Sequence, residues 1–233
     1  MKTLSASTKA YLGLFIFVLV LRLLLFLFPA EYVLPQQEQM TSLPFIVVVF
    51  ALGLLGVRLT QKTGFAEMWD ARVNNTQRFL IPALIGLGFG IASVIFDLVQ
   101  PLGAEIQIPL PASLMVYPIG GVLEEILFRL LLTLALIWFV SKVVFKGKHD
   151  EPVFWVVSVA VGLLYSFLQI GQYSVLTGQP VDLLVALRFL VIIGAFFVTA
   201  AYLFRKYGFL AAISLRLADY LIFHILWGGL FLH

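Results

Sequence analysis

The 233-residue chain contains no cysteine, and charged residues make up only 12% of it. The absence of cysteine excludes disulfides, thiolate metal sites and a cysteine nucleophile. The charged fraction is about half of the roughly 25% that is usual in soluble domains. Because 62% of the residues are hydrophobic, a soluble core cannot hold all the apolar side chains, and long apolar runs indicate lipid as the solvent. The sequence therefore predicts one all-α integral membrane domain over residues 1-233.

Apolar runs of about 20 residues, the length that crosses a hydrocarbon core, divide this domain into a polytopic transmembrane bundle. We expect seven spans at about 10-29, 43-58, 79-99, 112-141, 153-171, 184-204 and 208-231. The first follows a basic start, as in a signal peptide. Its apolar stretch is longer than the roughly 7–15 residues of such a peptide, and no small-residue cleavage site follows. We expect it to be retained as a membrane helix.

Three of the predicted loops, 30-42, 100-111 and 172-183, contain neither lysine nor arginine. The other loops carry the basic residues, and cytoplasmic loops are the basic ones. We therefore expect a cytoplasmic N-terminus and an outer C-terminus, in a multi-pass protein of a prokaryotic inner or plasma membrane. Segment 62-77 is interpreted as an ordinary connecting helix. The alternative is an interfacial helix with Phe65, Met68 and Trp69 toward lipid.

Nine ionisable residues lie inside the predicted spans, where each charge costs roughly 2.5–3.5 kcal/mol on insertion scales. They are Arg22, Asp97, Glu124, Glu125, Arg129, Arg188, Arg216, Asp219 and His224. Asp97 and Arg188 lie near outer span ends, so we expect them to reach the interface. Arg216 and Asp219 are three residues apart on one helix, and we expect them to pair.

The stretch GGVLEEILFR at 120-129 places three charges within six residues. Glu125 and Arg129 are four residues apart with the acid first, the favourable order for an ion pair on a helix. Glu124 points about 100° away around the helix and needs another partner. At 1.5 Å per residue, Glu124, Gln169 and His224 lie about 25, 24 and 22 Å from the cytoplasmic end of their spans. This common depth makes Glu124 a candidate general base and His224 a candidate partner.

The residues Glu124-Glu125-Ile-Leu-Phe128-Arg129 are similar to the EExxFR motif of the CPBP, or Abi, intramembrane proteases, relatives of the type II CAAX prenyl endopeptidases. The resemblance covers a core of about 79-231. It implies that Glu124 activates water and that Glu125 and Arg129 support it. A histidine of a second motif, FxxxH, would assist, and a third motif, HxxxN or HxxxD, would stabilise the oxyanion.

The second and third motifs are altered in this chain. Tyr165 and Gln169 stand where the resemblance implies Phe and His. In one frame Arg216 and Tyr220 occupy the third motif, with Asp219 beside them. In the other frame His224 is followed four residues later by Gly228 instead of Asn. Gln169 can donate and accept hydrogen bonds but carries no titratable proton.

These residues lead to three functional hypotheses. The first is an intramembrane peptidase that hydrolyses a membrane-associated peptide with Glu124, Glu125, Arg129 and His224. The second is an inactive family member that serves as a scaffold or accessory subunit of a membrane protein complex. The third is a small transporter, since buried charges also mark ion paths. We expect the lipid bilayer as a partner, with a membrane-anchored peptide or a membrane protein complex, and no nucleic acid.

A metal site is a further alternative within the first hypothesis. Zinc held by Glu124 and His224, with Glu125 as a third ligand, would be weak, because Glu125 would have to leave Arg129.

Overall fold

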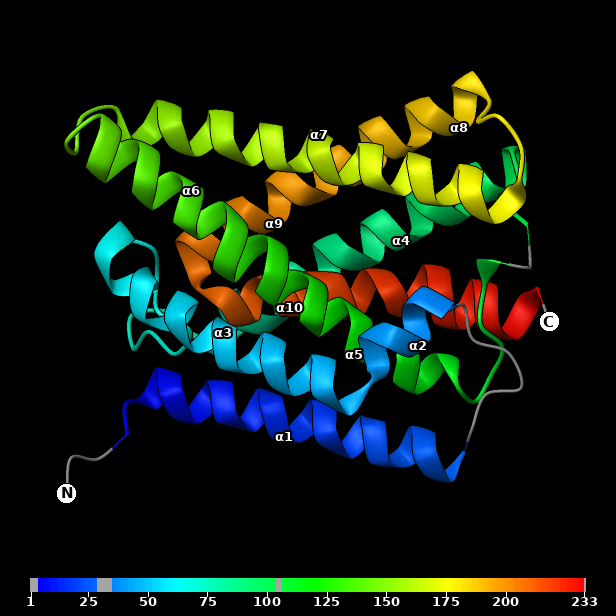
Figure 1. The fold of residues 1–233 in the computed structure, drawn as a ribbon, viewed down its shortest axis with the longest axis horizontal. Helices are drawn as coiled ribbons and strands as arrows, with labels where there is room; N and C mark the ends of the chain where they lie inside the picture. The colour runs from blue at the N-terminus through cyan, green and yellow to red at the C-terminus, as the bar shows by residue number, and fades with distance from the viewer. Residues whose placement is uncertain (1–3, 29–34, 104–105, 233) are drawn as a thin grey trace.

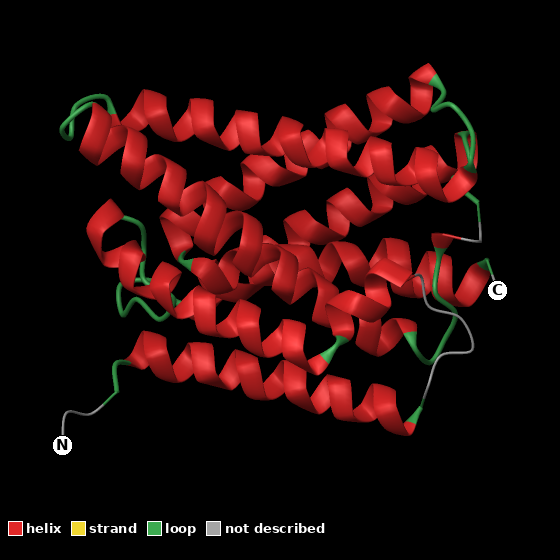
Figure 2. Ribbon diagram, in the orientation of Figure 1, coloured by secondary structure: helices red, strands yellow, loops and turns green. Residues whose placement is uncertain are grey.

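The computed structural model describes residues 4–28, 35–103 and 106–232. These residues form helices joined by loops, without a strand among them (Figure 2). Seven of the helices are long and apolar enough to cross a membrane. They are Ala6–Leu27, Leu43–Thr63, Thr76–Val99, Ser113–Val144, Asp150–Thr177, Leu183–Tyr207 and Phe209–Phe231. The predicted helical bundle with seven spans is confirmed.

Four of the spans combine α-helical and π-helical segments, which widen the helix locally. The elements in chain order are α1 (Ala6–Leu27), α2 (Pro35–Thr41), α3 (Leu43–Thr63), η1 (Thr76–Leu80), α4 (Ile81–Val99), α5 (Ser113–Glu125), η3 (Ile126–Thr133), α6 (Leu134–Trp138), η4 (Phe139–Val144), α7 (Asp150–Thr177), α8 (Leu183–Arg188), η5 (Phe189–Ile193), α9 (Gly194–Tyr207), α10 (Phe209–Tyr220) and η6 (Leu221–Phe231). Three of the π segments begin directly after residues singled out by the sequence, Glu125, Arg188 and Tyr220. Such segments are frequent at functional sites.

The spans run side by side along one direction, and α1 begins at the end of the bundle opposite to the end of η6 (Figure 1). The loops after α3 and η4 and the turn between α9 and α10 lie at the end where α1 begins (Figure 1). The basic residues that the sequence assigned to the loops lie in these connections or in the helix ends beside them. The assignment of this end to the cytoplasm stays a prediction from charge.

The last span, α10 with η6, occupies the centre of the bundle (Figure 1). Of its apolar stretch 56% is buried, against 17% for α1. Gly86 and Gly90 on α4 allow this close packing, because a Cβ at Gly86 would overlap the carbonyl of Leu215, and one at Gly90 would come within 2.7 Å of Ile222. Small residues that let helix backbones approach are typical of membrane helix contacts.

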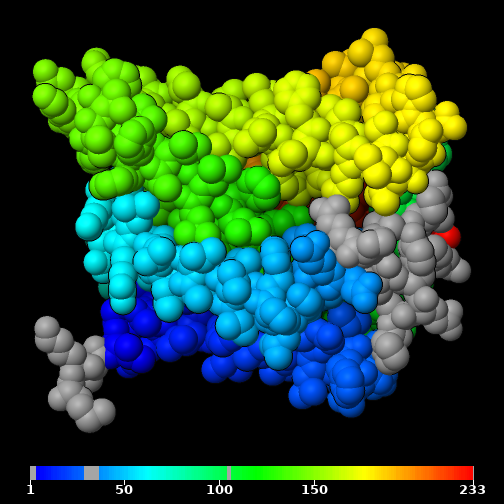
Figure 3. All heavy atoms as spheres, in the orientation of Figure 1, coloured from blue at the N-terminus to red at the C-terminus, as the bar shows by residue number. Residues whose placement is uncertain are grey.

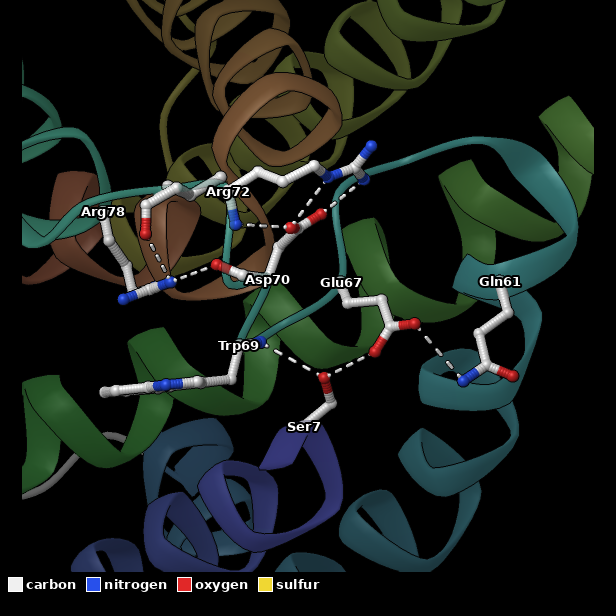
Figure 4. A network of polar contacts seen from close by, with 8 residues as sticks. Ser7, Gln61, Glu67, Trp69, Asp70, Arg72 and Arg78 are labelled. Atoms are coloured by element: carbon white, nitrogen blue, oxygen red, sulfur yellow. Dashed lines mark hydrogen bonds and ion pairs between the residues drawn. The ribbon is translucent and has the colours of Figure 1, made fainter. Parts of the chain in front are cut away.

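The connection between α3 and η1 corrects the expected helix over 62-77. Helix α3 ends at Thr63, its C-cap residue Gly64 has a left-handed φ of 74°, and the chain continues as a series of turns. Phe65 and Met68 are buried in the core rather than facing lipid, whereas Trp69 is 43% exposed. The backbone finds polar side chains as partners: Ser7 Oγ accepts from Trp69 N at 3.2 Å (Figure 4). Such local hydrogen bonds compete with helix formation.

The same connection is held by Asp70, Arg72 and Arg78 (Figure 4). Asp70 Oδ1 accepts from the backbone N of Arg72 at 2.9 Å, and its carboxylate also binds the Arg72 guanidinium. Nη2 of Arg78 donates to the carbonyls of Asp70 and Val73, both at 2.8 Å. The Arg72 guanidinium lowers the pKa of Asp70 to about 2.

Asp97 and Arg188, which we expected to reach the interface, pair with each other inside the bundle. Both are buried, and Nη1 of Arg188 lies 3.2 Å from Oδ1 of Asp97. Asp97 also accepts from the backbone N of Leu102 at 3.0 Å and from the Trp227 indole at 2.8 Å. The two charges satisfy each other, so neither needs water.

Candidate functional site

A cavity of about 200 Å³ lies among α2, α4, α5, α7, the α8–η5–α9 span and the last span. The residues that form its walls are spaced along their helices as residues on one helix face are. On α7 and on the last span, lining residues recur at intervals of three and four, which places them on one face of each helix. The lining residues include Tyr117, Glu124, Tyr165, Gln169, Arg216, Asp219, Tyr220 and His224. The common depth predicted for Glu124, Gln169 and His224 thus corresponds to one shared cavity.

Glu125 is fully buried and is held by two arginines. Nε and Nη2 of Arg216 donate to its Oε1 at 2.9 and 2.8 Å. Nε of Arg129 lies 3.5 Å from its Oε2, which confirms the predicted ion pair four residues apart. The Arg129 guanidinium also stacks 3.7 Å from the centre of the Phe197 ring, a cation–π contact. Glu125 and Arg129 therefore lie buried beneath the cavity and are not among the residues that line it.

Glu124, the residue before Glu125, lines the cavity, and 17% of its side chain is exposed. Its Oε2 accepts from the Tyr220 hydroxyl at 2.8 Å and lies 3.6 Å from Nη1 of Arg216. Tyr165 lies near enough to interact with the same carboxylate. The partner that the sequence left undefined for Glu124 is thus found on α10. One carboxylate oxygen is anchored, and the group still faces open space.

Gln169 donates from Nε2 to the Tyr165 hydroxyl at 2.8 Å. The two residues that replace the second motif are therefore bonded to each other beside Glu124. Because a primary amide has two N–H donors and one acceptor oxygen, Gln169 retains a donor and an acceptor for a molecule in the cavity.

His224 lines the cavity, and its ring forms a hydrogen bond with Gln107 from the loop before α5. Its Nδ1 lies 3.0 Å from Oε1 of Gln107, which also accepts from the Tyr117 hydroxyl at 3.0 Å. Since an amide oxygen only accepts, this contact predicts that Nδ1 carries the proton and that Nε2 of the neutral ring is an acceptor. The ring stacks on Tyr117 with centroids 4.4 Å apart.

Gln107 also explains one altered motif position. A Cβ at Gly228 would come within 2.5 Å of the Gln107 amide. The amide of Gln107 therefore fills the space that a side chain four residues after His224 would need. Sequence reasoning missed Gln107 and Tyr117. The spacing of Tyr117, seven residues before Glu124 on one helix face, was an available signal, whereas no local pattern marks a loop residue such as Gln107.

Asp219 corrects another expectation. No ion pair within 4 Å joins it to Arg216 in the part of the chain that the structure describes. Arg216 instead crosses to Glu124 and Glu125, and its guanidinium lies 4.3 Å from the Phe196 ring centre. Asp219 lines the cavity, and no hydrogen bond to its carboxylate is found within residues 4–28, 35–103 and 106–232.

Glu124 and His224 line one cavity, but the third ligand expected for a weak zinc site, Glu125, does not join them there. Within the described ranges, no three histidine, cysteine or acidic side chains are grouped as a metal site requires. Glu125 is held by two guanidiniums and His224 by Gln107. The residues present thus do not fit a zinc ion.

No family model, curated protein or solved structure matches this chain. The resemblance to the CPBP proteases therefore stays a prediction from the motifs.

Proposed function

We propose that the protein is a membrane-embedded hydrolase that cleaves a membrane-associated peptide, with Glu124 as general base. The observation that carries the proposal is the convergence of Glu124, Gln169 and His224 on one cavity. A base must face space for water and substrate, and its carboxylate must be held in position. Glu124 meets both requirements through its exposure to the cavity and its bond to Tyr220.

In the proposed reaction, Glu124 takes a proton from a water molecule whose oxygen attacks the peptide carbonyl carbon. The proton then passes to the leaving amine as the carbon–nitrogen bond breaks. Nε2 of His224, as an acceptor, orients the water, and the second N–H of Gln169 donates to the developing oxyanion. Preorganised donors of this kind are usually the largest single contribution to acyl-transfer catalysis.

The surroundings of the cavity support entry from the membrane. Its lining includes Met40 and Thr41 of α2 and Gln172 and Leu176 of α7. These two elements come to the surface on one face of the bundle, where α2 is blue and the C-terminal half of α7 is yellow (Figure 3). A peptide anchored in the membrane would approach Glu124 between them.

The test is cleavage of a panel of membrane-anchored peptides by purified protein in proteoliposomes, in water enriched in ¹⁸O. Mass spectrometry should find one ¹⁸O in each new carboxylate. Glu124→Gln should lower the rate about 10²- to 10⁴-fold, the usual contribution of a general base. Glu151→Gln is the matched control, because the Glu151 side chain is exposed and does not line the cavity. An inert wild type, or a Glu124→Gln variant as fast as wild type, would contradict the proposal.

A scaffold without catalytic activity is the second candidate, and the cluster of Glu125 with Arg129 and Arg216 favours it. This cluster joins α5 and η3 to α10 through buried ion pairs. Under this hypothesis the protein copurifies with a stable membrane partner, and Glu124→Gln leaves that complex unchanged.

A further inference from the structure

The charges around the cavity do not balance. Glu124, Glu125 and Asp219 are three carboxylates, whereas Arg129 and Arg216 are two guanidiniums. Arg188 also lines the cavity but pairs with Asp97. With all five groups ionised, the cluster would have one negative charge in excess, and an uncompensated charge at membrane depth is strongly unfavourable.

Asp219 carries this excess. The four other charged groups of the cluster are joined by contacts of 2.8 to 3.6 Å, and Asp219 takes part in none of those within the described chain. It lies on the same face of α10 as Arg216 and Tyr220 and lines the cavity with them. A carboxylate aimed into a cavity requires a proton or a positively charged ligand there.

The other residues that line the cavity favour an ammonium group over a divalent metal ion. The same cavity is lined by aromatic rings, among them those of Tyr173 and Phe189. Such rings attract ammonium groups through cation–π interactions. A divalent metal ion would instead need several free oxygen ligands, and the other carboxylates of the cluster are engaged by arginines.

The apolar part of the wall indicates what carries the cation. Leu176, Ile192 and Ile193 line the same cavity as Asp219, so an alkyl chain bound there would find apolar contacts. We propose that the cavity binds the protonated primary amine of a membrane-dissolved amphiphile, with Asp219 as its counter-ion. This binding does not depend on the proposed hydrolysis.

The test uses wild-type protein in phosphatidylcholine nanodiscs and radiolabelled dodecylamine, which is protonated at pH 7, with binding to empty nanodiscs subtracted. Wild type should bind one dodecylamine per chain saturably. Dodecanol, which has no charge, and ethanolamine, which has no alkyl chain, should not saturate the site. Asp219→Asn should weaken dodecylamine binding about 10- to 100-fold, as expected for loss of a charged hydrogen-bond partner.

Asp182→Asn is the matched control, because Asp182 caps α8 from an exposed position and asparagine caps a helix equally well. Asp219→Ser tests the same charge if Asp219→Asn does not fold. The proposal is overturned if wild type shows no saturable binding, if dodecanol binds as tightly, or if both Asp219 variants bind like wild type. Because no cleavage is measured, failure here is distinct from failure of the proposed hydrolysis.

Discussion

Arg216 donates two hydrogen bonds to a single oxygen of Glu125, from Nε at 2.9 Å and from Nη2 at 2.8 Å. The two residues are 91 positions apart and join α10 to α5. Both are buried, so the bond forms where water cannot replace it. This contact places Tyr220, four residues after Arg216, against Glu124.

Loss of this contact should destabilise the bundle strongly. Arg216→Met leaves Glu125 buried with only Arg129 at 3.5 Å, and breaking a buried pair on one side costs about 3–5 kcal/mol. The measurement is the free energy of unfolding in mixed micelles. Glu151→Gln, which breaks an exposed pair with Arg205, serves as the control and should leave the unfolding free energy unchanged. An Arg216→Met variant as stable as wild type would show that the pair contributes nothing.

Two glycines on α4 should respond differently to the same substitution. Gly86→Ala brings a methyl group onto the Leu215 carbonyl, and overpacking costs about 1–3 kcal/mol. Gly88→Ala meets no atom within 4 Å and should be neutral or stabilise by about 0.5–1 kcal/mol, since alanine favours a helix. Thermal unfolding of both variants checks the prediction, and equal midpoints would contradict the close approach of α4 and α10.

The sequence predicts the spans and the helix faces, but it does not predict which residues of different helices pair. The lengths of the apolar runs define the seven spans, and helical periodicity explains why Tyr165 and Gln169, or Arg216 and Tyr220, share a face. The pairing of Arg216 was predicted wrongly because sequence spacing favours the neighbour Asp219. The choice between Asp219 and Glu125 depends on how α10 packs against α5, and helix packing brings together residues that local spacing does not connect.

The α3–η1 connection also differs from the prediction, because it forms turns where the sequence predicted a helix. Its apolar residues Phe65 and Met68 fit an interfacial helix by pattern alone. The left-handed turn at Gly64 and the side-chain partner Ser7, on a distant helix, favour turns instead. Gln107 is likewise a loop residue that reaches the site only after long-range folding.

Stability should depend on pH through Asp70. Hydrogen bonding to Arg72 lowers the pKa of Asp70 to about 2 in the folded protein, against about 3.9 in an unfolded chain. A carboxyl with a lowered folded pKa stabilises above the unfolded pKa, and this contribution is lost as pH falls from about 4 toward 2. Unfolding of wild type and Asp70→Asn should differ by a constant amount from pH 5 to 8, and the difference should shrink below pH 4. A difference independent of pH would contradict the bond to Arg72.

The protonation of His224 gives the most direct check of the site. Gln107 accepts from Tyr117 and from Nδ1 of His224, so the neutral ring should carry its proton on Nδ1 and keep Nε2 free as an acceptor. ¹⁵N NMR of histidine-labelled protein in bilayers distinguishes the two nitrogens, and a His224→Gln sample identifies the signal. Gln107→Leu removes the acceptor, so both tautomers should appear and stability should fall by about 1–3 kcal/mol through unpaired buried groups. A wild-type proton on Nε2 would exclude the acceptor role given to His224, because that nitrogen could then only donate to a water beside Glu124.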